Sequence, residues 1–250
     1  MSDLAPSWQN LPLLKRLVPS FRRRAARLLW RDGFGVVRRD GALFLLDLRN
    51  WADQSILMRG AFERAQLAYL LAQIAERQCR TFLDVGANLG TYAIFVALRT
   101  PCRRIVAFEP DRRAYSQLRA NLMLNGLLDR VETRELAVSD RTGEVAFAPG
   151  PDTHTVLSKI AESEGSGAVV PAVRLDDALS VVGERIALKI DIEGHERAAL
   201  AGMAALLRGN RCFLQVECFA RNAPDFIAAI GGLGYRLLHR IDDDHYFAND

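Results

Sequence analysis

Short apolar runs alternate with amphipathic stretches along the chain from residue 80 onward. The runs lack the polar alternation of a half-exposed strand, which indicates strands that are covered on both faces of a sheet. The amphipathic stretches between them predict helices, and strands joined through helices run parallel. The runs are RTFLDV, RRIVAFE, RVETRELAV, RIALKIDI and RCFLQVE.

The last two stretches, YRLLHRI and HYFAND, flank the turn DDD and predict a closing hairpin. Five strand–helix units followed by a hairpin predict an α/β fold. We expect a doubly wound, mostly parallel seven-stranded sheet with an antiparallel C-terminal edge hairpin. A helix over 52–77 is predicted to precede the first sheet strand, and EGHERAALAGMAALLRG is expected to form a helix after the fourth.

The N-terminal region has a different pattern. FGVVRRDGALFLLDL predicts a β-hairpin that turns at Asp40 and Gly41. Residues 20–31 form an amphipathic segment with an arginine-rich face. We therefore expect an appendage over 1–50, made of a basic helix and a hairpin, and a main domain over 51–250. Residues 149–168 are the longest stretch without periodicity and are predicted to form a loop over a site.

Charge is distributed unevenly along the chain. Residues 1–40 hold nine basic and three acidic residues, a balance of +6, so the formal net charge of +3 leaves about −3 for the rest. The body is therefore not expected to bind nucleic acid. Two interpretations of 20–31 stay open: peripheral contact with an anionic membrane, or, as we prefer, a cap on the sheet with a solvated arginine face.

Other bulk features place the chain in the cytoplasm. No apolar run approaches the roughly 20 residues of a membrane span, and the start lacks the pattern of a secretory signal. The four cysteines show no paired spacing, which predicts reduced thiols rather than disulfides or a zinc site.

The first predicted strand ends in a glycine turn, TFLDVGANLGTY, with the pattern D-x-G-x-x-x-G. This pattern differs from the G-x-G-x-x-G of dinucleotide oxidoreductases and from the P-loop, so both classes are excluded. Glycine lets the backbone approach a ligand closely. The expected cofactor contacts in this turn are Asp84, Gly86, Asn88 and Gly90.

A second carboxylate identifies the kind of ligand. Glu109 ends the next strand, 19 residues after Gly90, where a carboxylate can accept both ribose hydroxyls. Asp84 favours a cationic ligand, and S-adenosylmethionine combines a ribose with a sulfonium and an ammonium group. The alternative is that Asp84 and Glu109 cap helix N-termini. After the third strand, Ser139 and Asp140 either accept from the adenine amino group or form a simple β-turn.

The chain resembles the FkbM family of S-adenosylmethionine-dependent methyltransferases, within the class I methyltransferase fold. The resemblance covers about residues 80–220, and its most specific segment is LKIDIEGHERAALAG. It implies methyl transfer from S-adenosylmethionine to a hydroxyl of a sugar, a glycan or a natural product. A looser match in GAFERAQLAYL brings Glu63 into the cofactor site.

Transfer to a hydroxyl needs in-line alignment and a group that removes a proton. Asp191 is the expected base or the residue that orients one, and His195 is the alternative base because its ordinary pKa lies near neutrality. Glu193 joins this catalytic cluster, although helix N-termini also favour acidic residues. A divalent metal is left open, with Asp191 and Glu217 as its possible ligands. Nearby, we expect Lys189 to pair with a carboxylate, while His154 lies in the predicted loop.

The acceptor is expected to be a small molecule or glycan, and the oligomeric state stays open. A different class of function also stays open, in which the chain binds S-adenosylmethionine as a non-catalytic partner or sensor protein.

Overall fold

The structure is a computed structural model that describes residues 30, 32–59, 63–150, 159–160 and 168–250. The chain divides into two compact units, one that ends at residue 62 and one that spans Glu63–Asp250. The amphipathic segment at 20–31 lies outside the described residues except for Trp30. His154 also lies outside them.

The first unit contains the predicted hairpin. Strands β1 (Phe34–Arg39) and β2 (Ala42–Asp47) pair antiparallel around Asp40 and Gly41, whose φ angles are 48° and 93°. Two consecutive positive φ angles are those of a type I′ turn, as expected for an Asp-Gly pair.

The helix predicted over 52–77 is wrong as a single element. Helix α2 (Trp51–Arg59) belongs to the first unit and α3 (Arg64–Glu76) to the second. Glu63, immediately before α3, has a φ of 52°, and a left-handed residue cannot continue a right-handed helix.

The second unit is built on the seven-stranded sheet that the sequence predicts. The strand order is β12-β13-β11-β10-β3-β4-β5, and all neighbouring strands are parallel except in the two pairs that β13 forms, with β11 and with β12. The expected C-terminal hairpin is thus confirmed. The strands are β3 (Thr81–Val85), β4 (Arg104–Phe108), β5 (Glu132–Arg134), β10 (Arg185–Ile190), β11 (Arg211–Glu217), β12 (Arg236–Ile241) and β13 (Asp244–Ala248).

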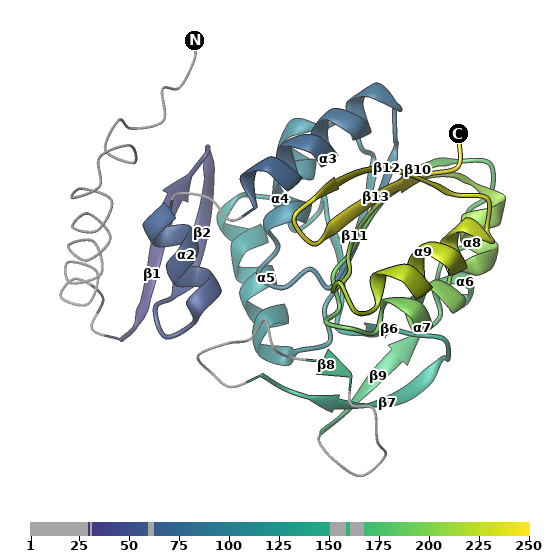
Figure 1. The fold of residues 1–250 in the computed structure, drawn as a ribbon. Helices are drawn as coiled ribbons and strands as arrows, with labels where there is room; N and C mark the ends of the chain where they lie inside the picture. Colours follow the sequence, from purple (N-terminus) through teal and green to yellow (C-terminus); the bar gives the residue numbers. More distant parts are fainter. Residues whose placement is uncertain (1–29, 31, 60–62, 151–158, 161–167) are drawn as a thin grey trace. The chain divides into compact units, whose positions relative to one another are not determined.

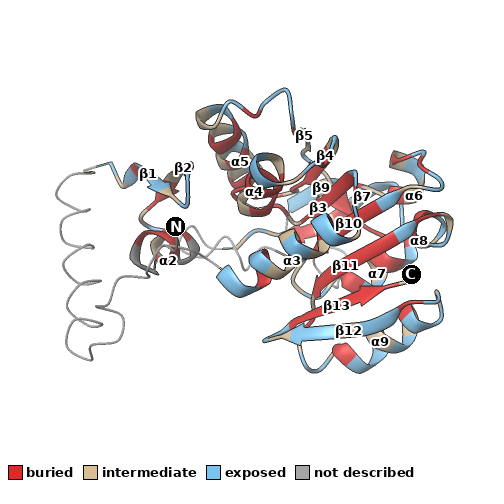
Figure 2. Ribbon diagram, turned by 90° about the horizontal axis from the view of Figure 1, so that it is seen from above, coloured by how far each residue is buried: buried red, intermediate tan, exposed pale blue. Residues whose placement is uncertain are grey.

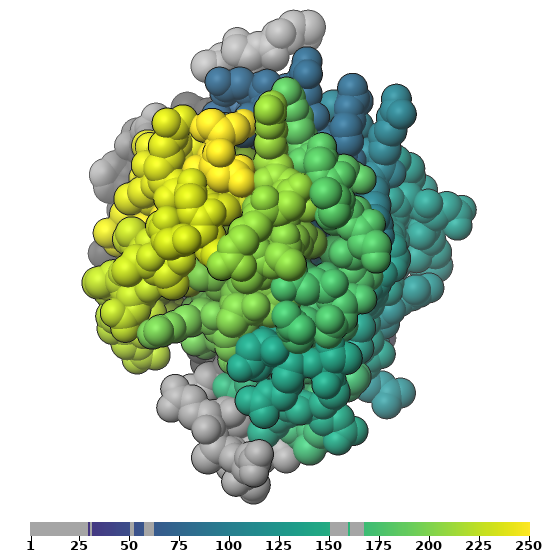
Figure 3. All heavy atoms as spheres, turned by 90° about the vertical axis from the view of Figure 1, so that its right-hand side faces the viewer, coloured from purple at the N-terminus to yellow at the C-terminus, as the bar shows by residue number. Residues whose placement is uncertain are grey.

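Helices cover both faces of this sheet (Figures 1 and 2). One face carries α3, α4 (Thr91–Arg99) and α5 (Arg112–Leu124). The other carries α6 (Leu175–Ala178), α7 (Glu196–Ala201), α8 (Ala204–Gly209) and α9 (Ala223–Gly231), which form one continuous surface in Figure 3. The face under α6–α9 holds a large apolar core, so the sheet's polar residues are concentrated on the α3–α4 face.

A small second sheet was not predicted. The run RVETRELAV splits, because β5 leaves the main sheet after Arg134 and β6 (Ala137–Val138) pairs with β9 (Ala168–Val173). Strand β7 (Gly143–Ala148) pairs antiparallel with β9 and with β8 (Lys159–Ile160). The predicted loop over 149–168 therefore contains a short strand.

The predicted helix after β10 is also broken in two, at Gly202. A Cβ atom at this position would lie 1.8 Å from the carbonyl oxygen of Ser139. The Gly202 carbonyl in turn accepts from the Asp176 amide at 3.0 Å instead of continuing the helix. Close approach of the segment after β6 thus ends α7 and separates it from α8.

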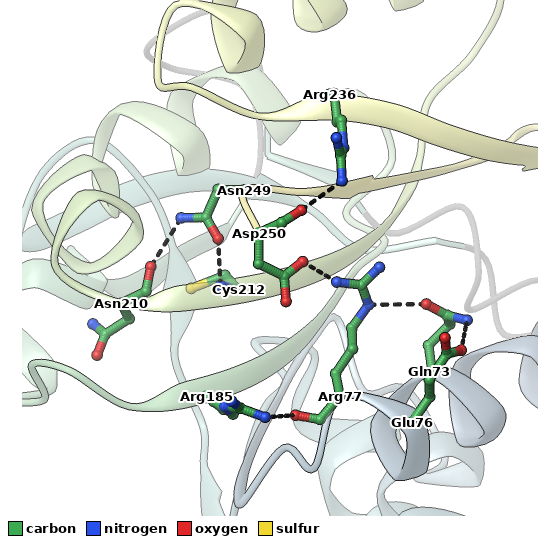
Figure 4. A network of polar contacts seen from close by, with 9 residues as sticks. All are labelled: Gln73, Glu76, Arg77, Arg185, Asn210, Cys212, Arg236, Asn249 and Asp250. Atoms are coloured by element: carbon green, nitrogen blue, oxygen red, sulfur yellow. Dashed lines mark hydrogen bonds and ion pairs between the residues drawn. The ribbon is translucent and has the colours of Figure 1, made fainter.

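A polar network ties the last residues to the amino ends of the parallel strands (Figure 4). The Asn249 side chain accepts from the Cys212 amide at 2.8 Å and donates to the Asn210 carbonyl at 2.9 Å. Arg77, which follows α3, forms an ion pair with Asp250. These contacts hold the C-terminal end of β13 beside the amino end of β11.

Among the residues that the structure describes, no helix is long and apolar enough to cross a membrane.

We predict that Gly202→Ala will lower the free energy of unfolding by about 2–3 kcal/mol, because the new methyl group collides with a fixed carbonyl oxygen. Gly231→Ala is the matched control, since its Cβ meets nothing within 4 Å. It should be neutral or stabilise the fold by up to about 1 kcal/mol. Urea denaturation measures both changes, and equal effects of the two substitutions would contradict the role given to Gly202.

Candidate functional site

The glycine turn after β3 is fixed by neighbouring strands. Gly86 has a φ of 82°, and a Cβ there would lie 1.8 Å from the Asp191 carbonyl oxygen at the end of β10. The amides of Gly86 and Ala87 both donate to the Phe108 carbonyl at 3.0 Å. Because Gly86 has no side chain, the turn after β3 can pack directly against the end of β10. This packing brings the turn and Asp191 together.

Glu109 braces the same turn from the end of β4. One carboxylate oxygen accepts from the Asn88 amide at 2.7 Å and the other from the Asp111 amide at 2.9 Å. Burial raises the pKa of Glu109 to about 7, although these two hydrogen bonds oppose the shift. A carboxylate offers about four acceptor positions, so each oxygen keeps capacity for a ligand hydroxyl.

Asp84 lies under helix α4. Its Oδ2 accepts from the Ala93 amide at 3.0 Å, in the first turn of that helix. The geometry is therefore that of the helix-capping alternative, and a direct cofactor contact by Asp84 stays a prediction. Its Oδ1 is fully buried and has no hydrogen-bond partner among the described residues, and burial raises the pKa of this carboxyl to about 6.

Asp84 begins a row of polar side chains that crosses the sheet. Lys189 on β10 pairs in register with Asp84 and with Gln215 on β11, and Gln215 pairs with Tyr246 on β13. Directly opposed residues in a sheet point to the same face, so all four lie on the α3–α4 face. Within the part of the chain that the structure describes, Gln215 Oε1 and Tyr246 Oη are, like Asp84 Oδ1, buried without a hydrogen-bond partner.

Lys189 is the cation at the centre of this row. Its Nζ lies 2.8 Å from Asp191 Oδ2 and 4.7 Å from the centre of the Tyr92 ring. Burial disfavours its charge, yet Asp191, Glu63 and Asp84 raise the pKa of Lys189 above its ordinary value. The lysine thus pairs with a carboxylate, as the sequence predicts, and stays charged.

Asp191 and Glu217 act as a coupled pair of carboxyl groups. Burial raises the pKa of Asp191, but the Lys189 charge and a hydrogen bond from Glu217 lower it further, so Asp191 is the anion. Burial and the Asp191 charge raise the pKa of Glu217 far above its ordinary value, so Glu217 carries the shared proton. Both side chains are only partly buried and remain open to a ligand.

Glu193 stands near this pair. One oxygen from each of Asp191, Glu193 and Glu217 lies within 4.8 Å of the others, which is close enough to hold a cation. One Asp191 oxygen is already held by the Lys189 ammonium group, which supplies positive charge without a metal. Glu193 has a φ of 53°, and the following residues turn the chain from β10 into α7.

Glu63 joins the cluster through a chain of hydrogen bonds. Tyr92 donates to Glu63 at 2.8 Å, and the Gln215 amide donates to Tyr92 Oη at 2.9 Å and to Asp244 at 2.8 Å. Burial raises the pKa of Glu63 to about 7, while Lys189 opposes the shift. The looser of the sequence predictions thus lies beside the catalytic candidates.

Ser139, Asp140 and His195 form a separate group. The Ser139 hydroxyl lies 2.9 Å from His195 Nε2 and 3.1 Å from Asp140 Oδ1. Burial lowers the pKa of His195, with Asp140 and Arg141 as its charged neighbours. The structure therefore brings His195 together with the predicted adenine contacts rather than with Asp191. Glu196 accepts from the Gly194 amide at 2.8 Å and fixes the same loop.

Three members of the cluster, Tyr92, Gln215 and Asp244, were missed from the sequence. The available signal was the polar residue in a fully buried strand: Lys189 and Gln215 are the polar interruptions in RIALKI and RCFLQVE. Tyr92 gives no such signal, because an aromatic residue in the first turn of a helix is ordinary core.

We predict that Asp84→Asn will flatten the dependence of stability on pH. The Asp84 pKa of about 6 in the fold exceeds its ordinary value of 3.8, so the fold binds a proton that the unfolded chain has lost. This contribution is full below pH 3.8 and is lost as the pH rises through about 6. The parent should lose up to about 1.4 kcal/mol per pH unit in this window relative to the variant.

Urea denaturation between about pH 4 and about pH 6, the window between the two pKa values, measures this slope. Asp129→Asn is the control, because Asp129 is exposed and its substitution should leave the slope unchanged. Identical slopes for the parent and Asp84→Asn would contradict the raised pKa of Asp84.

Comparison with known proteins identifies relatives of the second unit. A family model for the methyltransferase FkbM domain matches residues 84–237. The 2-O-methyltransferase NoeI from Sinorhizobium fredii is 33% identical over 168 residues, which cover 59% of this chain and 66% of NoeI. The 31-O-demethyl-FK506 methyltransferase FkbM from Streptomyces tacrolimicus is 28% identical over 209 residues, covering 70% and 79% of the two chains.

Among solved structures, the chain is similar to the methyltransferase FkbM from Methylobacillus flagellatus. The TM-score is 0.50 at 13% identity, and the similar region covers 96% of this chain and 60% of that one. This likeness concerns the fold. The chain spans slightly less than two thirds of the length of NoeI, and 4% of the antimetabolite synthetase AmbE from Pseudomonas aeruginosa, to which it is 36% identical over 90 residues.

Proposed function

This chain belongs to the FkbM methyltransferase domain family, and we propose that it transfers a methyl group from S-adenosylmethionine to a hydroxyl group of a sugar, glycan or natural-product acceptor. The names of two relatives support oxygen as the acceptor atom: NoeI is a 2-O-methyltransferase, and FkbM is a methyltransferase of 31-O-demethyl-FK506. The observation that carries the proposal is the contact of the glycine turn with Asp191, which joins a nucleoside-type site to a carboxylate cluster.

The residues of the turn fit the cofactor. Glu109 already accepts from two amides and keeps acceptor capacity for the ribose hydroxyls. The turn region carries no lysine that would favour a phosphate, and the adjoining Asp191 is held as an anion, which suits a positively charged ligand. When bound, S-adenosylmethionine supplies the electrophilic methyl group and a neutral thioether leaving group.

Asp191 is the base in this proposal. Lys189 fixes Asp191 Oδ2, so the carboxylate has a defined orientation at the carboxyl end of β10. The acceptor hydroxyl loses its proton as the new bond to carbon forms, and Asp191 receives it. Glu217 keeps its own proton during this step, because two adjacent carboxylates cannot both stay ionised at low cost.

Lys189 adds a second contribution to the same step. It holds Asp191 ionised below neutral pH, so the base is present without a metal ion. The matching disadvantage is a low basicity, which is tolerated because the hydroxyl becomes more acidic as its bond to the methyl carbon forms. The proposal therefore assigns most of the rate to alignment of the acceptor and a smaller part to proton removal.

We predict that Glu109→Ala will weaken binding of S-adenosylhomocysteine at least about tenfold, since a charge-assisted hydrogen bond is worth roughly 1.5–3 kcal/mol. Calorimetry measures the affinity, and the parent should not bind NADH. Glu144→Ala, at an exposed position on β7, is the control and should bind as the parent does. Parental affinity of Glu109→Ala would remove the ribose assignment.

We predict that Asp191→Asn will keep the affinity for S-adenosylhomocysteine and lower kcat by about 10²-fold or more, the range of a lost general base. Transfer of labelled methyl groups to a panel of monosaccharides, oligosaccharides and polyketide alcohols provides the assay. Asp225→Asn, at an exposed position on α9, is the control. Turnover at the parental rate would place the base elsewhere.

The same assay separates catalysis from the non-catalytic alternative. A parent protein that binds S-adenosylhomocysteine but methylates no acceptor in the panel would favour a sensor or partner role.

A further inference from the structure

The structure assigns His195 to recognition of the cofactor's adenine: we propose that it is a positioning residue, which holds Asp140 through the Ser139 hydroxyl, and not the base of methyl transfer. This inference rests on the proposed function, because it concerns the S-adenosylmethionine site.

The amide, the carbonyl oxygen and the hydroxyl of Ser139 all contact other parts of the protein. Ser139 is completely buried, and its amide donates to the Val173 carbonyl at 3.0 Å. Its carbonyl oxygen occupies the space that a Cβ of Gly202 would fill, and its hydroxyl lies 2.9 Å from His195 Nε2. Helix α7 therefore clamps Ser139 from both ends, through His195 before the helix and Gly202 after it.

The Ser139 hydroxyl has a single proton, which determines the direction of both of its hydrogen bonds. Asp140 Oδ1 can only accept while it is ionised, so the hydroxyl donates to it at 3.1 Å. His195 Nε2 must then carry a hydrogen and donate to Ser139 Oγ. The result is a directed chain from His195 through Ser139 to Asp140, which fixes the direction of the Asp140 carboxylate.

This chain of hydrogen bonds ends on Asp140 Oδ1 and leaves the other carboxylate oxygen, Oδ2, available to a ligand. The hydrogen bonds from Ser139 and from Arg141 both end on Asp140 Oδ1. Among the described residues, Asp140 Oδ2 has no partner, and the side chain is 45% exposed. An exposed, oriented carboxylate oxygen is a good acceptor for an exocyclic amino group, so Asp140 rather than Ser139 is the adenine contact.

The loop that carries His195 also links the two parts of the proposed cofactor site. The loop from Asp191 to His195 starts against the Gly86 turn and ends on Ser139. It therefore connects the two places where the proposed cofactor is held. A histidine whose Nε2 donates to a buried hydroxyl orients that hydroxyl and cannot accept a proton at the same nitrogen. Asp191, by contrast, is a carboxylate that Lys189 orients in the neighbouring cluster.

The test compares two substitutions of one histidine. Glutamine places an amide donor near the position of Nε2 but cannot act as a base, and leucine provides neither. We expect His195→Gln to retain most of the affinity for S-adenosylhomocysteine and to lose far less kcat than Asp191→Asn does. We expect His195→Leu and Ser139→Ala each to bind it about tenfold more weakly, with no further loss in the double variant.

A second readout reports adenine recognition itself. S-inosylhomocysteine carries a carbonyl oxygen where the adenine has its amino group, so it faces Asp140 Oδ2 with an acceptor. The parent should prefer the adenosyl compound, and His195→Leu should lose about tenfold of this preference. A merely structural role of His195 would weaken both ligands equally. His239→Leu, at an exposed position on β12, is the matched control.

The outcomes are separable. A His195→Gln variant that binds as the parent does but loses turnover makes His195 the base and overturns this inference while leaving the methyltransferase intact. An unchanged preference between the two ligands in His195→Leu overturns it as well. A parent that binds neither ligand refutes the proposed function together with the inference.

Discussion

One buried ammonium group organises the chemistry of this protein. Lys189 lies among five carboxyl groups on the α3–α4 face of the sheet, and its charge lowers the pKa of each of them: Glu63, Asp84, Asp191, Glu217 and Asp244. Burial acts in the opposite direction on all five. The balance leaves Asp191 ionised and Glu217 protonated, so this cation helps to determine which of the two carboxyl groups is charged. Replacing this cation with an apolar residue would leave buried carboxylates uncompensated, which is more costly than any single lost hydrogen bond.

The sheet divides this work between its two faces. Along β10 and β11, residues that face the apolar core under α6–α9 alternate with residues that face α3 and α4. Every second position of these strands can therefore be polar without disrupting the main core. The absent side chain of Gly86 then joins the glycine turn to the end of β10. A rigid contact between strands, rather than a flexible loop, sets the distance between the nucleoside-type site and the proposed base, and alignment of that kind is what a displacement reaction requires.

Much of the fold and part of the site follow from the sequence. The continuous apolar runs of β3, β4, β10 and β11 predict the parallel sheet, because strands buried on both faces need no polar alternation. The split between β5 and β6 depends on the pairing of β6 with β9, and the break at Gly202 depends on the close approach of Ser139. Both are contacts between distant segments, so neither could be predicted from the local pattern. His195 was expected near Asp191 from its position in DIEGHE, but the turn through Glu193 and Gly194 directs it to Ser139 instead.

The antiparallel placement of β13 has a consequence for the order of folding. Strand β13 lies between β11 and β12, although it follows both along the chain. Until it inserts, the edge of β11 has no neighbour on that side, and the Gln215 side chain lacks both its row neighbour Tyr246 and its acceptor Asp244. During synthesis the pairing of β11 on this side is thus completed only after β13 has left the ribosome. A nascent chain would carry an open sheet edge until that moment, the state in which pairing with other chains is most favoured.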